Sequence, residues 1–361
     1  MLRILFSGAN WYGSNARSCA EGLRRLGCDV LDIDSHSFVP QVRDFTSRAV
    51  RRLLSFRLVS ELNNFILETA EQYRPDIFVA FKGNYIHAST LTRLSSWGIA
   101  LYNYYPDTSA FTHGKWLPKS LPGYDCVFYT KPFWYTDVTK HIKLKDGLFL
   151  PHGYDVGLHR PVELSARDVE EYGCDVSFIA IHTRYKERLL KDLICLRPNL
   201  NLCIWGDGWT KRCESKELRR CIKGFPLLGE RYVRAIQAAR INLAIMSGPV
   251  SGASSGDLTT SRTYTIPASG GFMLHERNRE VLDLYKEGEE IACFDSVSEL
   301  AEKIDYYIAH AAERELTAQA GHTRCARSYS YDNRMAEILR WHFEHWGIGN
   351  SQMVQAEVEA S

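Results

Sequence analysis

The chain has 361 residues, of which 45% are hydrophobic and 24% charged, and its formal net charge is +1. This length favours two domains that each bury a core, and the balanced charge excludes the strong field expected of a nucleic-acid-binding protein. The opening MLRILFSG lacks the cationic and long apolar segments of a signal peptide. The ten cysteines form no C-x-x-C pair, which is typical of reduced thiols. We therefore expect a cytoplasmic protein with neither a metal site nor a cofactor.

The N-terminal half alternates short apolar runs with amphipathic stretches, which is the pattern of a parallel sheet with crossover helices. Apolar positions at helical spacing predict helices that end at Gly27, around residues 62–69 and over residues 87–97. Predicted strands cover residues 3–6, 30–33, 77–81, 99–103, 126–129 and 148–150.

Residues 151–161 (PHGYDVGLHRP) interrupt this alternation with glycine and proline, so we predict a linker there. A second α/β series follows, with strands at residues 176–180, 202–205, 242–245, 272–274 and 291–294. Ser296 and Glu299 have the spacing of a capping box at the start of a further helix. We expect an N-terminal domain over residues 1–155, a C-terminal domain over 156–330, a helix over 331–348 that crosses back to the first domain, and a frayed tail over 349–361.

The segment RTYTIPASGGFML, which begins at Arg262, places an arginine and hydroxyl groups at a predicted helix start. Helix N-terminal N–H groups attract anions, and the planar arginine fork binds two phosphate oxygens. The segment therefore suits a bound diphosphate, although an ordinary glycine-punctuated strand–helix–strand unit has the same pattern.

This segment and the run EGEEIACF near residue 290 resemble motifs of the CgeB-like glycosyltransferases, a branch of the GT-B enzymes. The likeness covers most of residues 174–340 and implies an α/β protein of two Rossmann-like domains facing a cleft. It implies a metal-independent enzyme that transfers a sugar from a nucleoside diphosphate donor to a hydroxyl acceptor.

The resemblance also implies donor residues. Arg262 would bind the diphosphate with help from Ser261 and Thr263, while Gly270 and Gly271 would allow close backbone approach. Many retaining GT-B enzymes carry two acids with seven residues between them, and the matching positions here hold Asp257 and Thr265. Asp257 is thus a catalytic candidate, although a loop Asp is also a common cap. Thr265 replaces a carboxylate that would contact the ribose.

Weaker donor candidates follow two predicted strands. Gly206 and Asp207 resemble the family's G-x-G-W element, and a plain turn would look the same. Arg184 matches a basic region of the family, but a solvent-exposed helix charge is the commoner use.

Acceptor candidates follow strands of the first domain, because ligands bind at carboxyl strand ends in open α/β sheets. They include Gly8, Trp11 and Tyr12 in the loop after the first strand, and Lys82 after the third. Asp107 is the first candidate for a general base in an inverting enzyme and His113 the second, although an Asp after proline is also an ordinary turn residue.

Residues 43–58 (RDFTSRAVRRLLSFRL), from Arg43 to Leu58, carry five arginines among apolar residues. Such a stretch can lie on an anionic membrane and would suit a lipid-linked acceptor at the inner membrane face. A surface helix that packs its apolar side on the sheet is the commoner alternative.

Two other functions stay open at this point. A nucleotide-sugar 2-epimerase has the same fold and needs no acceptor. A non-catalytic nucleotide-sugar or glycan-binding protein would accommodate the change at Thr265.

Overall fold

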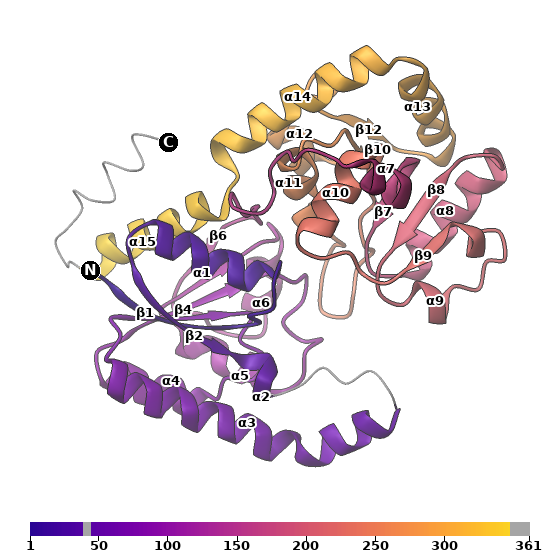
Figure 1. Cartoon of the computed structure of the whole chain (residues 1–361). Coiled ribbons are helices and arrows are strands. Elements are labelled where there is room, and N and C mark those ends of the chain that lie inside the picture. Colours follow the sequence, from indigo (N-terminus) through magenta and orange to yellow (C-terminus); the bar gives the residue numbers. More distant parts are fainter. Residues whose placement is uncertain (39–44, 347–361) are drawn as a thin grey trace. The chain divides into compact units, whose positions relative to one another are not determined.

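The structure is a computed structural model that describes residues 1–38 and 45–346, without the side chains of residues 45–55. The described chain forms two compact units (Figure 1). The first comprises Met1–His152, the loop Pro249–Ser255 and the segment that begins at Tyr331. The second comprises Gly153–Gly248 and Gly256–Ser330. The predicted tail 349–361 lies outside the described residues. The predicted basic stretch 43–58 begins a helix at Phe45, with side chains described only from Phe56 on.

The first unit is built on a parallel sheet of six strands in the order β2-β1-β3-β4-β5-β6. Its strands are β1 (Arg3–Gly8), β2 (Asp29–Asp34), β3 (Ile77–Phe81), β4 (Ala100–Tyr105), β5 (Cys126–Tyr129) and β6 (Gly147–Phe149). Its helices are α1 (Asn15–Arg25), α2 (Ser35–Phe38), α3 (Phe45–Tyr73), α4 (Ala88–Ser96), α5 (Trp116–Ser120), η1 (Leu121–Gly123), α6 (Trp134–Thr139) and α15 (Tyr331–Trp346). The chain reverses direction across the sheet between β1 and β3, which makes this the topological switch point.

Helices cover both faces of the first sheet (Figure 1). One face packs α1 and α15 through buried residues such as Leu23 and Met335. The other face packs α3 and α4 through residues such as Ile66 and Leu94. Because both faces are buried, the central strands β3, β4 and β5 consist of nearly continuous apolar runs.

The second unit repeats this plan with a parallel sheet in the order β12-β11-β10-β7-β8-β9. Its strands are β7 (Cys174–Ile179), β8 (Leu202–Trp205), β9 (Ile222–Gly224), β10 (Ala239–Ala244), β11 (Met273–Glu276) and β12 (Ala292–Phe294). Its helices are α7 (Ala166–Tyr172), α8 (Arg184–Leu196), α9 (Trp209–Arg212), η2 (Arg219–Cys221), α10 (Glu230–Ala238), α11 (Ser261–Ala268), α12 (Arg279–Leu284), α13 (Val297–Ala309) and α14 (Ala311–Ser328). Here the switch point lies between β7 and β10.

The second sheet also has a hydrophobic core on each face, and each core is packed by its own set of helices. Helices α8 and α13 pack one face of the sheet, with Leu190 and Ile304 fully buried. Helices α10 and α11 pack the other face through residues such as Ala235 and Ile266. The two parallel sheets and their flanking helices confirm the predicted class of two Rossmann-like domains.

Some local predictions differ from the structure. The short strand β9 was not predicted, because its sequence IKG has no apolar run and only the ladder with β8 defines it. Only half of the predicted capping box forms at α13. Ser296 accepts from the Glu299 N–H, but the Glu299 carboxylate accepts from the Asp295 N–H and pairs with Arg277. The basic partner attracts the carboxylate away from its own helix start.

Candidate functional site

The carboxyl ends of β7 and β10 form the first candidate site, because open α/β sheets bind their ligands at the switch point. Lys186 of α8 lies at this edge and is only 4% exposed. Its ammonium donates to Ser247 Oγ at 2.9 Å and to the Ile181 carbonyl at 3.4 Å. Burial, together with the charge of Arg262, lowers the pKa of Lys186 to about 7. A poorly compensated buried cation at a crevice indicates an anionic ligand.

Arg262 stands at the first turn of α11, in the same neighbourhood as Lys186. One guanidinium nitrogen donates to the Ile245 carbonyl at 2.9 Å, which anchors the side chain at the end of β10. Its Nε lies buried without a hydrogen-bond partner among the described residues. Burial lowers the pKa of Arg262, and the nearby charges of Asp257 and Glu276 oppose that change. The sequence thus identified one of the two cations at this edge.

The second cation was missed, although the sequence held a signal for it. Lys186 falls on the same helical face as Leu189, Leu190 and Leu193, which are buried. A lysine on an apolar helix stripe that begins just after a strand is a candidate for a buried ligand contact.

Two carboxylates offset part of the charge of the cations. The charges of Asp257 and Glu276 both act on Lys186 and Arg262. Glu276, at the end of β11, accepts hydrogen bonds from the Tyr185 hydroxyl and the Met246 N–H. Asp257 donates its backbone N–H to the Ser247 carbonyl at 2.9 Å. The structure therefore places Asp257 with Arg262 and adds Glu276, which the sequence gave no reason to select.

The predicted hydroxyl groups of α11 have different surroundings. Ser261 is half-buried in the first turn. Thr263 is fully buried, and its hydroxyl accepts from the Thr260 N–H and contacts His275 Nε2 at 3.0 Å. The prediction that Thr263 donates to a ligand is therefore corrected, since it caps the helix and braces β11. Thr265 lies within 2.7 Å of the Tyr232 hydroxyl and is almost completely buried.

Gly270 and Gly271 require a second correction, because they follow the carboxyl end of α11 whereas Arg262 begins it. Eight helical residues separate the two ends by about 12 Å. A Cβ at Gly271 would lie 2.4 Å from Ile236 Cγ2, so this glycine serves the contact between α11 and α10. These glycines do not bring backbone close to a ligand that Arg262 holds.

The Gly206–Asp207 turn after β8 is held by tight backbone packing. Gly206 has φ of +138°, and a Cβ there would lie 2.0 Å from the Ala180 carbonyl oxygen. The Asp207 carbonyl accepts the His182 N–H at 2.8 Å. The turn therefore fixes the loop that follows β7.

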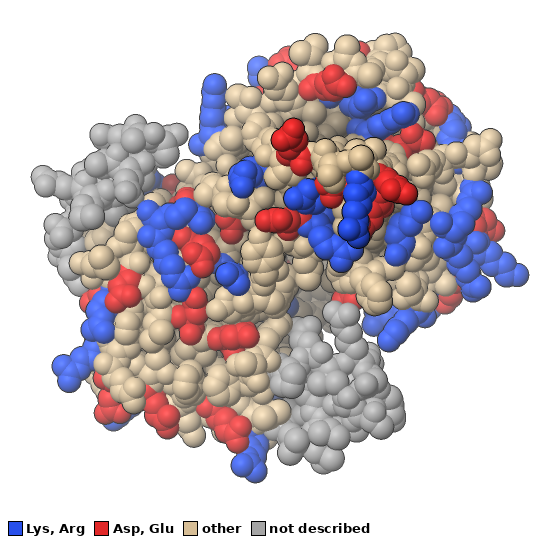
Figure 2. All heavy atoms as spheres, in the orientation of Figure 1, with Lys and Arg blue, Asp and Glu red and all other residues tan. Residues whose placement is uncertain are grey.

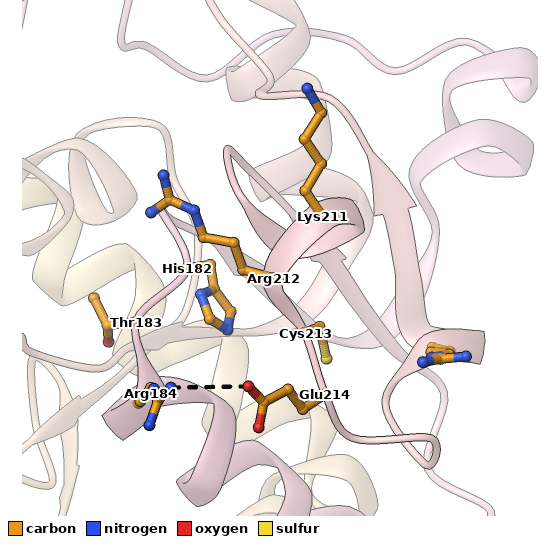
Figure 3. Close-up of a pocket in the computed structure, with 8 residues that line it drawn as sticks. His182, Thr183, Arg184, Lys211, Arg212, Cys213 and Glu214 are labelled. Carbon is orange, nitrogen blue, oxygen red and sulfur yellow. Dashed lines mark ion pairs between the residues drawn. The ribbon is translucent and has the colours of Figure 1, made fainter. Parts of the chain in front are cut away.

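Arg184 lies away from the Lys186 ammonium, in a pocket of about 640 Å³ beside α8 and α9 (Figure 3). The pocket is lined by His182, Thr183, Arg184, Lys211, Arg212, Cys213, Glu214 and Arg219. The Arg184 side chain is 88% exposed and lies 3.9 Å from Glu214. The structure thus assigns Arg184 to a separate basic pocket.

The second candidate site is the carboxyl edge of the first sheet. Gly8 ends β1, where a Cβ would lie 2.8 Å from the Ala16 Cβ, so α1 packs closely on the strand. Trp11 and Tyr12 follow, with 43% and 53% of their surfaces exposed. They present aromatic surface beside the switch point, as a sugar-binding loop does.

Lys82, Asp107 and His113 form one charged cluster at this edge. The Lys82 ammonium lies 2.7 Å and the His113 Nε2 2.8 Å from Asp107 Oδ2. Lys82 has φ of +70°, a conformation that is unusual for a residue with a side chain and is concentrated at functional sites. Its N–H donates to the Tyr104 carbonyl, which fixes this backbone at the end of β3.

The electrostatics of this cluster alter the expected roles. Burial alone raises the pKa of Asp107, but the His113 hydrogen bond and the Lys82 charge outweigh it and hold the pKa well below its usual range. A carboxylate so strongly stabilised in its ionised form is a poor proton acceptor. Asp107 is instead placed to orient the His113 ring, so the order of the two base candidates is reversed.

Across residues 1–38 and 45–346, no group of three or more His, Cys, Asp or Glu side chains has the arrangement of a metal site. Within the same part of the chain, no helix is both long and apolar enough to cross a membrane. The ten cysteines, all of them within the described residues, form no disulfide.

Comparisons with known proteins give the class of this architecture. Residues 183–340 match the family described as glycosyl transferase-like. Sucrose-phosphate synthase from Thermosynechococcus elongatus has a similar structure, with a TM-score of 0.66 and 12% identity over 96% of this chain and 100% of that one. HepE from Anabaena, solved with UDP-glucose, has a TM-score of 0.63 and 13% identity over 94% of this chain and 100% of that one.

A putative UDP-N-acetylglucosamine 2-epimerase from Listeria monocytogenes also shares the fold. Its TM-score is 0.55 and its identity 10%, over 97% of this chain and 98% of that one. No curated protein sequence matches the chain. The architecture is therefore that of the GT-B proteins, and the C-terminal part of the chain carries a glycosyl transferase-like domain.

Proposed function

We propose that the protein transfers a sugar from a nucleoside diphosphate donor to a hydroxyl acceptor, as a GT-B glycosyltransferase of the CgeB-like branch. The observation that carries this proposal is the pair of cations at the switch point of the second sheet, the buried Lys186 and the half-buried Arg262. HepE, which shares the fold, has been solved with UDP-glucose.

The donor diphosphate would lie against Lys186 and Arg262. Arg262 offers an unpartnered Nε, and the first turn of α11 adds its N–H groups and Ser261. When the bond to the sugar breaks, negative charge develops on the leaving diphosphate. Two prepositioned cations in a low-dielectric site stabilise that charge without a bound divalent ion.

The hydroxyl groups of Tyr232 and Thr265 would contact the donor ribose. They lie 2.7 Å apart, and burial raises the pKa of Tyr232, so the phenol stays neutral. Tyr232 is also close enough to Arg262 to sense its charge. This neutral pair stands where related enzymes carry a carboxylate, and it supplies both a donor and an acceptor.

The acceptor would bind at the carboxyl edge of the first sheet, beside Trp11 and Tyr12. If the enzyme inverts, His113 is the general base. Asp107 binds the Nε2 side of the ring, which leaves Nδ1 to take the proton of the acceptor hydroxyl. Lys82 holds Asp107 ionised and so maintains that tautomer.

The test is a thermal-shift screen with UDP, GDP, dTDP, CDP and CMP and their sugar conjugates on the wild type, Lys186→Met and Arg188→Met. Arg188 is exposed on the same helix and serves as the matched control. A ligand at a hundredfold its Kd stabilises by about 2.7 kcal/mol. We expect one nucleotide class to stabilise the wild type and the control but not Lys186→Met. If no nucleotide stabilises the wild type, the proposal is wrong.

The epimerase stays as a second candidate because the Listeria structure shares the fold. NMR of the donor sugar without an acceptor separates the two functions. Inversion at C2 would establish the epimerase, and acceptor-dependent release of the nucleoside diphosphate would establish the transferase. Binding with neither reaction would indicate a non-catalytic binding protein.

A further inference from the structure

We infer that the basic pocket beside α8 and α9 is a binding site for a phosphorylated small molecule, separate from the proposed donor site. It shares no lining residue with the cluster of Lys186, Arg262, Asp257 and Glu276. The inference does not depend on the proposed donor.

The lining side chains of the pocket carry an excess of positive charge, which the Glu187 carboxylate behind the wall offsets in part. Four of its lining residues are Arg or Lys and one is Glu, which leaves a formal charge of +3 with His182 neutral. Within the described part of the chain, Lys211, Arg212 and Arg219 form no ion pair, and the one acid lies 3.9 Å from Arg184 with both side chains largely exposed. Figure 2 shows basic side chains over the region of α8 and α9. Concentrated positive charge of this kind attracts phosphate groups.

Hydrogen bonds to one carboxylate hold the backbone of two walls of the pocket together. Glu187 of α8 accepts the backbone N–H groups of Glu214 and Ser215, each at 2.7 Å, and binds His182 Nε2 at 2.6 Å. It also accepts from the Cys213 thiol at 3.5 Å. One carboxylate therefore fixes the segment after α9 against the loop after β7.

The inner wall adds neutral donors. Thr183 caps α8, so the positive end of a helix of 13 residues lies at the pocket. In Figure 3, Arg184 and Arg212 extend from α8 and α9 with the buried His182 ring between them. Basic side chains and a helix start around one cavity suit a group with several oxygens.

The lining argues against a nucleobase as the occupant. It contains no aromatic ring other than His182 and no aliphatic side chain. A base needs flat apolar surface for stacking, whereas a phosphate ester or a diphosphate needs cations and hydrogen-bond donors. At about 640 Å³ the pocket has room for more than an inorganic ion, and this favours a sugar phosphate or a polyphosphate.

The test is isothermal titration with inorganic pyrophosphate and with glucose 6-phosphate. The starting protein is Lys186→Met, which disables the proposed donor site, and the pocket variant adds Arg184→Gln and Arg212→Gln. Both arginines are exposed, so these changes leave the core intact. The matched control adds Arg167→Gln, an exposed arginine on α7.

We expect at least one of the two probes to bind Lys186→Met and its Arg167→Gln derivative equally. In the pocket variant, affinity should fall by about tenfold or more, because two charge-assisted contacts are lost. Equal binding in the pocket variant and the control, or no binding of either probe to Lys186→Met, would overturn the inference. Loss of nucleotide binding when Arg184→Gln and Arg212→Gln are introduced into the protein that keeps Lys186 would show instead that the pocket is part of the donor site, which also overturns the inference.

Discussion

Replacing Lys186 with methionine should stabilise the unliganded protein while abolishing donor binding. Methionine keeps the length and the apolar stem of the side chain but removes the ammonium that bonds Ser247 Oγ and the Ile181 carbonyl. Because Lys186 is 4% exposed, its charge is held in a poorly solvated place until a ligand arrives.

The size of the effect follows from the pKa. Burial and the charge of Arg262 lower the pKa of Lys186 from 10.5 to about 7. At about 1.4 kcal/mol for each tenfold change in proton affinity, keeping this lysine charged costs the folded protein on the order of 5 kcal/mol. Losing two hydrogen bonds offsets part of that gain at about 1 kcal/mol each. A net stabilisation of about 2 kcal/mol or more is therefore expected at pH 6.

The pH dependence provides an internal control. Below about pH 7 the folded and unfolded states both hold the proton, so the cost of the buried charge is complete. Between about 7 and 10.5 the unfolded state binds more protons, and the stability of the wild type therefore rises with pH relative to the variant. The advantage of Lys186→Met should shrink over this range.

The assay is denaturant or thermal unfolding of wild type, Lys186→Met and Arg188→Met at pH 6, 7.5 and 9. The exposed Arg188 should change stability by less than about 0.5 kcal/mol at every pH. A Lys186→Met protein that is less stable than the wild type by the same amount at all three values would refute the reasoning. That result would mean that the lysine is a structural hydrogen-bond donor whose charge costs nothing.

Three further predictions concern the charged cluster of the first sheet and two tightly packed glycines of the second unit. His113→Ala and Asp107→Asn should each lower the turnover rate by about 10²–10⁴-fold without changing donor affinity. Steady-state kinetics measures the rate, and a normal rate in His113→Ala would exclude His113 as the base. Gly206→Ala should lower the free energy of unfolding by about 3 kcal/mol or more, because the new Cβ would meet the Ala180 carbonyl. A variant that melts at the wild-type temperature would contradict this prediction. Gly271→Ala should lower the free energy of unfolding by about 1–3 kcal/mol and leave the nucleotide Kd of the folded protein unchanged. A higher Kd in this variant would place the glycine at the ligand.

The sequence determined the layered α/β architecture, because hydrophobic periodicity is local information. The run IFVAF became β3 with the predicted bounds, and LCIW became β8. These strands are buried on both faces, so each shows an unbroken apolar run that a single sequence reveals. Arg262 could be selected for a similar reason, since a helix start that carries an arginine is visible along the chain.

Tertiary structure decided which side chains share an environment. Lys186 looked like one of several basic residues on α8 until packing buried it at the switch point while Arg184 stayed exposed. Asp107 looked like a base until Lys82, from the end of β3, and His113, from the same loop, lowered its pKa. Burial and the charges of distant neighbours set these properties, and neither depends on local sequence. The elements of the fold could therefore be predicted from the sequence, whereas the protonation and the partners of its charged groups required the folded chain.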